Sequence, residues 1–154
     1  MIGDILTNLL WATTESYIKD KSSINSKTEI FRELLIQEVS YNLEILNLLS
    51  QKKQSLTENQ KSQLLAAMDF EKFESFSQTG IPFKSIIEGK WDKKSFRKYS
   101  KLVENIDTKA QLVTRSYHRL KLFRLKEQLD IKSSQLTLNY VTFLFVETKK
   151  ALKD

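Results

Sequence analysis

The sequence predicts an all-α fold, and three observations support this prediction. The chain of 154 residues contains three glycines and one proline, the residues that most often interrupt helices, so long helical segments are permitted. Apolar residues recur in steps of three and four along most of these segments. Nine Phe, five Tyr and two Trp provide the large side chains of a core, which a disordered chain would lack.

We therefore expect one domain, residues 1–154, folded as an antiparallel helical bundle. A chain of this length can bury roughly 68–70% of the surface that its unfolded form exposes, so it needs no disulfide or metal for stability. Four main helices are expected at about 3–20, 27–52, 57–76 and 92–129, with a short helix at 82–88 and a C-terminal helix at 134–152.

The first two helices are expected on either side of a polar connection at residues 21–27. Ser26 and Glu29 have the spacing of a capping box, in which each side chain bonds to the backbone amide of the other residue, so the second helix should begin there. That helix carries one seam in steps of four and three, which we expect to be buried. The seam is Phe31, Leu35, Val39, Asn42, Leu46 and Leu49.

The helix expected at 57–76 also begins with a capping box, formed by Thr57 and Gln60. Gly80 should end this segment, and Pro82 suits the first turn of the short helix that follows. An aromatic cluster surrounds this region, and we interpret it as core packing, with a partner groove as the alternative. Its members are Phe70, Phe73, Phe76, Phe83 and Trp91.

The long helix expected at 92–129 contains no glycine or proline, and Asp92 can cap its start. Its apolar stripe is Val103, Ile106, Ala110, Val113, Tyr117 and Leu120. After Leu120 the pattern changes, because Arg124 falls on the stripe. Ser133 or Ser134 can cap the last helix, and we interpret its β-branched and aromatic middle as a buried helix rather than a strand.

The charge of the chain is concentrated in one stretch. The net charge is +6, and residues 90–126 contain twelve Lys or Arg against three Asp or Glu, so the rest of the chain is net negative. The apolar part of residues 2–11 is about half of the ~20 residues that a membrane span needs. We therefore expect a cytoplasmic protein with no transmembrane segment.

The inventory of reactive groups argues against an enzyme, a metal site or a cofactor. The chain has no cysteine and a single histidine, His118, so thiolate metal sites and most nucleophile–histidine pairs are excluded. It contains no P-loop and no Gly-x-Gly-x-x-Gly motif. We expect no catalytic residues.

One family of helical ribonucleases, the HEPN domains, provides a specific test. Its members carry Arg and His on one helix with four to six residues between them. Here Arg115 and His118 have only two residues between them, so this chain is similar to that family in size and helicity alone. A degenerate HEPN-like bundle is the third of three functional alternatives. We interpret His118 as a partly exposed residue of a basic helix.

A buried polar network is expected on the second helix. Asn42 interrupts the apolar seam, and Glu38 precedes it by one turn. A buried amide without partners costs roughly 1–3 kcal/mol, so Asn42 should bond across to another helix and fix its register. Arg124, the cation on the stripe of the long helix, is the expected counter-ion of Glu38. The alternative is that these three residues line a pocket.

The candidate binding surface is the basic stretch, in which cations alternate with Trp91, Phe96 and Tyr99. Cations with aromatic residues can hold phosphates and stack on bases, although a run of charges is more often a solvated face. The candidate residues are Lys93, Lys94, Arg97, Lys98, Lys101, Arg115, His118, Arg119 and Lys126. On a helix, the last four fall within one narrow sector, with Leu122 among them.

The leading hypothesis is a non-enzymatic helical interaction module, an accessory subunit of a bacterial-type macromolecular or defence-related complex. A protein partner is expected. Nucleic-acid binding without sequence readout, through the basic face, is the second alternative. Small helical subunits of CRISPR effector complexes are broadly similar in size and charge, but share no motif with this chain. Self-association of the chain is left open.

Overall fold

The computed structural model describes residues 21–51, 55–93, 97–131 and 134–154, and these residues form an all-α fold, as predicted. The expected helix at 3–20 lies outside the described residues. The helices are α2 (Lys21–Ser50), α3 (Glu58–Ala67), α4 (Glu71–Ser77), α5 (Ser100–Val103), α6 (Lys109–Gln128) and α7 (Gln135–Lys153). Two 3₁₀ turns, η1 (Phe83–Ser85) and η2 (Arg97–Tyr99), lie between α4 and α5.

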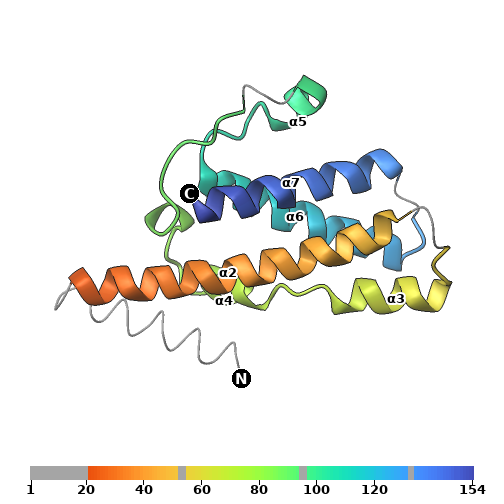
Figure 1. The fold of residues 1–154 in the computed structure, drawn as a ribbon, viewed down its shortest axis with the longest axis horizontal. Coiled ribbons are helices and arrows are strands. Elements are labelled where there is room, and N and C mark those ends of the chain that lie inside the picture. Colours follow the sequence, from red (N-terminus) through yellow and green to blue (C-terminus); the bar gives the residue numbers. More distant parts are fainter. Residues whose placement is uncertain (1–20, 52–54, 94–96, 132–133) are drawn as a thin grey trace.

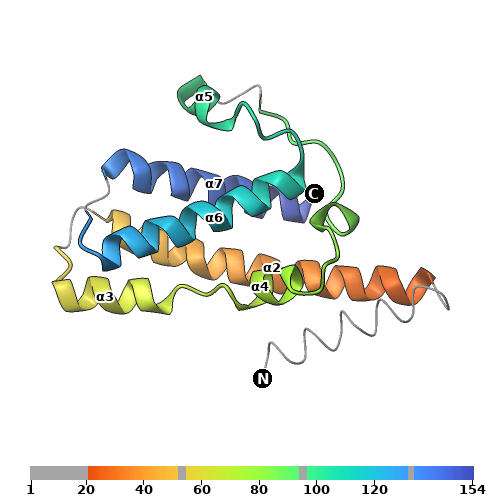
Figure 2. The ribbon, with the colours of Figure 1, turned by 180° about the vertical axis from the view of Figure 1, so that it is seen from behind.

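Three long helices form the centre of the fold, since α2 and α6 both pack along α7. Helices α3 and α4 lie on one side of this group, and α5 lies on the opposite side (Figures 1 and 2). The seam of α2 is buried as predicted, from Phe31 to Leu46, and Leu49 at its end is half-buried. The predicted stripe from Val103 to Leu120 is buried as well, although it does not belong to one helix.

The start of α2 differs from the prediction. Because α2 already includes Lys21, Ser26 lies inside the helix and is not its N-cap. By contrast, the capping box of Thr57 and Gln60 is confirmed. The Thr57 hydroxyl accepts from the Gln60 amide at 3.1 Å, and the Gln60 side chain accepts from the Thr57 amide at 3.0 Å.

The helix expected at 57–76 is interrupted, because α3 ends at Ala67 and α4 begins at Glu71. The backbone between them bonds to α2 instead of continuing the helix: the amide and carbonyl of Asp69 both pair with the side chain of Asn42. The short helix expected at 82–88 is reduced to the 3₁₀ turn η1, which ends at Ser85 with Ile86 as its C-cap.

The prediction of one helix at 92–129 is wrong. The chain instead makes an excursion over residues 90–108, closed at its base by an antiparallel bridge between Lys90 and Thr108. Trp91, Val103 and Ile106 pack in a small core with Leu112 of α6 and Leu144 of α7. This burial, together with a capping box at Thr108, places the helix start at Lys109 rather than beside Asp92.

The C-terminal helix is confirmed in type and extent. The side chain of Ser134 accepts from the Thr137 amide at 3.2 Å and caps α7. The middle of α7, interpreted above as a buried helix, contributes Val141, Leu144 and Phe145 to the interior. Asp130, with a φ of 57°, follows α6 and lets the chain turn toward α7.

Replacing Thr108 with Ala should destabilise the protein by about 1 kcal/mol, because the substitution removes the hydroxyl that accepts from the Gln111 amide at 3.1 Å. Thr108→Ser keeps this acceptor and should stay close to the unsubstituted chain. Urea unfolding followed by circular dichroism measures both variants. Equal stability of the Ala and Ser variants would show that this cap does not hold the start of α6.

Candidate functional site

Glu38 is the centre of the buried polar network, and its partners differ from those expected. Its carboxylate accepts the backbone amides of Lys72 at 2.7 Å and Phe73 at 3.2 Å, in the first turn of α4. It also accepts the hydroxyl of Tyr117, on α6, at 2.7 Å. One buried side chain of α2 therefore joins α4 and α6, and it satisfies amides that have no partner within their own helix.

Asn42 bonds across to another part of the fold, as expected, but its partner is the backbone between α3 and α4 rather than a residue within a helix. Its side-chain amide donates to the Asp69 carbonyl at 2.6 Å, and its side-chain oxygen accepts the Asp69 amide at 2.8 Å. The side chain is fully buried, so both of its polar ends need such partners. These two bonds fix the connection between α3 and α4 against α2.

The expected contact between Arg124 and Glu38 is wrong. The guanidinium of Arg124 lies over the ring of Phe70, with its central carbon 4.3 Å from the ring centroid. Phe70 in turn packs edge-on against Tyr117, whose hydroxyl is bonded to Glu38. The aromatic ring therefore takes the place of a carboxylate as the partner of this cation.

Burial raises the pKa of Glu38 from its ordinary value of 4.5 to about 7, although the Lys72 amide and the Tyr117 hydroxyl act in the opposite direction. Burial and the Glu38 carboxylate also raise the pKa of Tyr117 well above its ordinary value, so this hydroxyl stays protonated and donates. Glu38 and Tyr117 bond to each other, and Glu38 also bonds to α4, so this pair stabilises the packing of α2 against α4 and α6.

The aromatic cluster is core packing, as interpreted, with one exception. Phe73 stacks on Phe83 and Tyr117, and Phe76 packs against Phe83 and Phe31. Trp91 is not part of this cluster and lies in the small core under the 90–108 excursion.

The first group of predicted cations is dispersed. Lys94 lies outside the described residues, and the side chain of Arg97 is likewise not described. Lys93 is neutralised, because its ammonium group pairs with Asp107 at 2.9 Å and donates to the Glu104 carbonyl. Lys98 and Lys101 are exposed on the excursion.

The aromatic residues of this stretch do not present free faces for bases. Trp91 is buried, and Tyr99 stacks on Phe143 with ring centroids 4.5 Å apart. Tyr99 also contacts Tyr140. The expected alternation of cations and stacking aromatic rings is therefore not realised by these two residues.

The second group, on α6, stays together. Arg115, His118, Arg119 and Lys126 lie within one helix, with His118 exposed and the other three half-exposed. The Arg119 guanidinium lies over the ring of Tyr140 on α7, 6.0 Å from the ring centroid. Its Nε is buried and has no hydrogen-bond partner. Arg115 and Arg119 both interact with Tyr140 of α7, so these two residues follow the boundary between α6 and α7.

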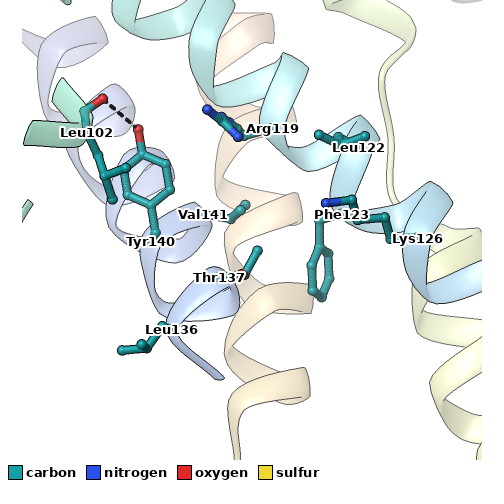
Figure 3. Close-up of a pocket in the computed structure, with 9 residues that line it drawn as sticks. All are labelled: Leu102, Arg119, Leu122, Phe123, Lys126, Leu136, Thr137, Tyr140 and Val141. Atoms are coloured by element: carbon teal, nitrogen blue, oxygen red, sulfur yellow. Dashed lines mark hydrogen bonds between the residues drawn. The ribbon is translucent and has the colours of Figure 1, made fainter. Parts of the chain in front are cut away.

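A cavity of about 210 Å³ lies at this boundary, and we call it the α6–α7 groove (Figure 3). Its lining is mostly apolar and includes no acidic residue. It is formed by Leu102, Arg119, Leu122, Phe123, Lys126, Leu136, Thr137, Tyr140 and Val141. The Tyr140 hydroxyl donates to the Leu102 carbonyl at 3.2 Å, which holds α5 at the edge of the groove.

The apolar part of the groove was not predicted as a site. Leu136 is 68% exposed and Leu102 is 48% exposed, although both line the cavity. Leu125 and Leu129 are also exposed, and with Leu122 they recur in steps of three and four, on the sector that carries the cations. In the sequence, the only sign of this exposed apolar surface is that the apolar stripe of α6 ends at Leu120 and the following leucines fall on another face of the helix.

Glu38 also lines a separate cavity of about 390 Å³ together with Tyr41, Asp69 and Lys72, but Asn42 and Arg124 are not part of its lining. Among the described residues, no cluster of His, Asp or Glu has the arrangement of a metal site, and no helix combines the length and apolar character that crossing a membrane requires. Comparisons of the chain with models of protein families, with curated proteins and with solved structures found no match.

Replacing Glu38 with Gln should change how stability depends on pH. Folding raises the pKa of Glu38. The contribution of Glu38 to the free energy of unfolding is therefore fully present below its unfolded pKa of 4.5 and is lost as pH rises through about 7. Gln does not titrate, so the stability of Glu38→Gln relative to the unsubstituted chain should increase with pH across this window, by up to about 1.4 kcal/mol per pH unit.

Urea unfolding at several pH values between 4.5 and 8 measures this difference. Glu44→Gln is the matched control, since it removes a carboxylate from the exposed side of the same helix. A constant difference between Glu38→Gln and the unsubstituted chain across these pH values would contradict the raised pKa.

Proposed function

We propose that this chain is a non-enzymatic interaction module, acting as an accessory subunit, whose α6–α7 groove binds an acidic amphipathic helix of a partner protein. The observation that carries the proposal is the composition of the groove: an apolar floor with Arg119 and Lys126 at its wall and no acidic residue in its lining. Amphipathic helices commonly bind by placing their apolar face in a groove of this kind.

The length of the surface also suits a helix. From Arg115 to Lys126, α6 extends about 16 Å at a rise of roughly 1.5 Å per residue, which corresponds to about three helical turns. The exposed side chains of Leu102 and Leu136 stand on the other elements that border it. A helix lying along α6 would cover these leucines and bring its own polar residues near the cations.

The charge of the surface favours an acidic partner over a second copy of this chain. In a two-fold symmetric dimer the same patch faces itself, so Arg115, Arg119 and Lys126 would lie near their own counterparts. The net charge of +6 adds to this repulsion. An acidic helix would instead neutralise the cations, and the complementary charges would speed and orient the association.

Nucleic-acid binding has less support, although the cations on α6 and on the excursion would suit phosphates. Of the aromatic residues in the basic stretch that the structure describes, Trp91 is buried and Tyr99 stacks on Phe143, so neither presents a free face to a base. A ribonuclease function has no further support beyond the presence of Arg115 and His118 on one helix.

An acetylated and amidated helical peptide of alternating Leu and Glu at steps of three and four should bind the full chain. Fluorescence anisotropy of the labelled peptide measures this affinity. Leu136→Glu should weaken binding at least tenfold, because it places a carboxylate beside the acidic peptide and removes an apolar contact. Since Leu136 is 68% exposed, the variant should fold normally, which circular dichroism can verify.

Lys121→Gln is the matched control on α6, because Lys121 pairs with Glu74 of α4, away from the groove. This variant should bind the peptide almost as the unsubstituted chain does. Single-stranded RNA and vesicles with anionic lipids serve as competing probes. If either binds through Leu136 and Arg119 while the peptide does not bind, the proposed protein partner is wrong.

A further inference from the structure

We infer that the partner helix carries two acidic residues seven positions apart, with large apolar residues three and four positions after the first. This inference rests on the proposed function and adds a spacing rule to it. Arg119 and Lys126 both line the groove and are seven residues apart on α6, which corresponds to about 10.5 Å along the helix. Leu122 and Phe123 line the groove between them.

The cavity has the size of a site for a side chain rather than for a small molecule. Its volume of about 210 Å³ is below the range of roughly 300–1,000 Å³ that is usual for small-molecule pockets. Its lining includes Leu122, Phe123, Leu136 and Val141 (Figure 3). A large apolar side chain would fill this space and replace water on apolar surface.

Arg119 is the expected binding partner of the first acidic residue of the partner helix. Its guanidinium lies over the Tyr140 ring, and its buried Nε has no acceptor, which is an unfavourable state for a charged donor. A carboxylate at the edge of the cavity, with a small rotation of the Arg119 side chain, would provide that acceptor. Arg binds carboxylates through two parallel hydrogen bonds, so this contact would be directional.

Lys126 is the expected binding partner of the second acidic residue of the partner helix. Its neighbours on α6 are already paired, since Glu127 binds Lys61 of α3 and Lys121 binds Glu74 of α4. Within the described residues the structure records no carboxylate paired with Lys126. Its ammonium group, at the wall of the groove, is therefore available to an acidic residue of the partner.

The spacing is the same whichever way the partner helix runs. A partner helix close to parallel or antiparallel to α6 has the same rise per residue, so carboxylates seven positions apart face Arg119 and Lys126 in both cases. Apolar residues at the third and fourth positions after the first acid then lie over the cavity. A pattern of Glu-x-x-Leu-Leu-x-x-Glu satisfies both directions.

A sixteen-residue peptide with this pattern, in an Ala and Gln background, is the probe. The comparison peptide has the same composition, but its second Glu is moved one position closer to the first. This shift rotates the carboxylate by about 100° around the helix, away from the cations. Fluorescence anisotropy with the full chain should give an affinity at least tenfold weaker for the shifted peptide.

Arg119→Gln and Lys126→Gln should each weaken binding of the matched peptide about tenfold, and Lys121→Gln should not. The variant with both substitutions should bind the matched peptide and a peptide with both Glu residues replaced by Gln with nearly equal affinity. The comparison of the two peptides uses the unsubstituted chain, so it stands even if Arg119→Gln folds poorly.

Two results would overturn the inference and are distinguishable. Equal affinities for the matched and shifted peptides, with both abolished by Leu136→Glu, would reject the spacing rule and leave the proposed groove intact. If neither peptide binds, the spacing rule and the proposed function are both rejected.

Discussion

The packing of α6 against α7 is the constraint on which the rest of the structure depends. At the centre of this contact Ser116 is fully buried, and its hydroxyl bonds to that of Thr148 at 2.6 Å and to the Leu112 carbonyl at 2.8 Å. Small, fully bonded polar side chains let two helices approach closely without leaving a buried donor unpaired. Since the opposite stripe of α6 is buried around Tyr117, the sector with Arg115, Arg119 and Lys126 must lie at the boundary with α7 and solvent.

The second determinant of the fold is a set of buried hydrogen bonds between elements that are distant in sequence. Glu38 accepts hydrogen bonds from α4 and from Tyr117 of α6, and Asn42 holds the segment between α3 and α4. Buried polar groups of this kind are unfavourable unless every donor and acceptor is satisfied, so they tolerate only one arrangement of the helices around them. Arg124 extends the same cluster through Phe70 rather than through a charge pair.

The excursion at 90–108 connects these architectural features with the surface. Its base is closed by the bridge between Lys90 and Thr108, and its buried residues pack on α6 and α7. Through the bond from Tyr140 to the Leu102 carbonyl, it places α5 beside the groove. The apolar walls of the groove thus come from three elements, and the cations come from one.

The sequence by itself determined the helical class, the capping box at Thr57, a serine cap at residue 133 or 134, the buried seam of α2 and the grouping of Arg115, His118, Arg119 and Lys126. These features depend on neighbours within one or two turns, and local spacing encodes them. Only the tertiary structure decided where the helix expected at 92–129 breaks, that Arg124 meets Phe70, and that Leu102 and Leu136 border one cavity. Each of these depends on contacts between segments far apart in the chain, where the burial of Trp91 and Ile106 outweighs an uninterrupted helical pattern.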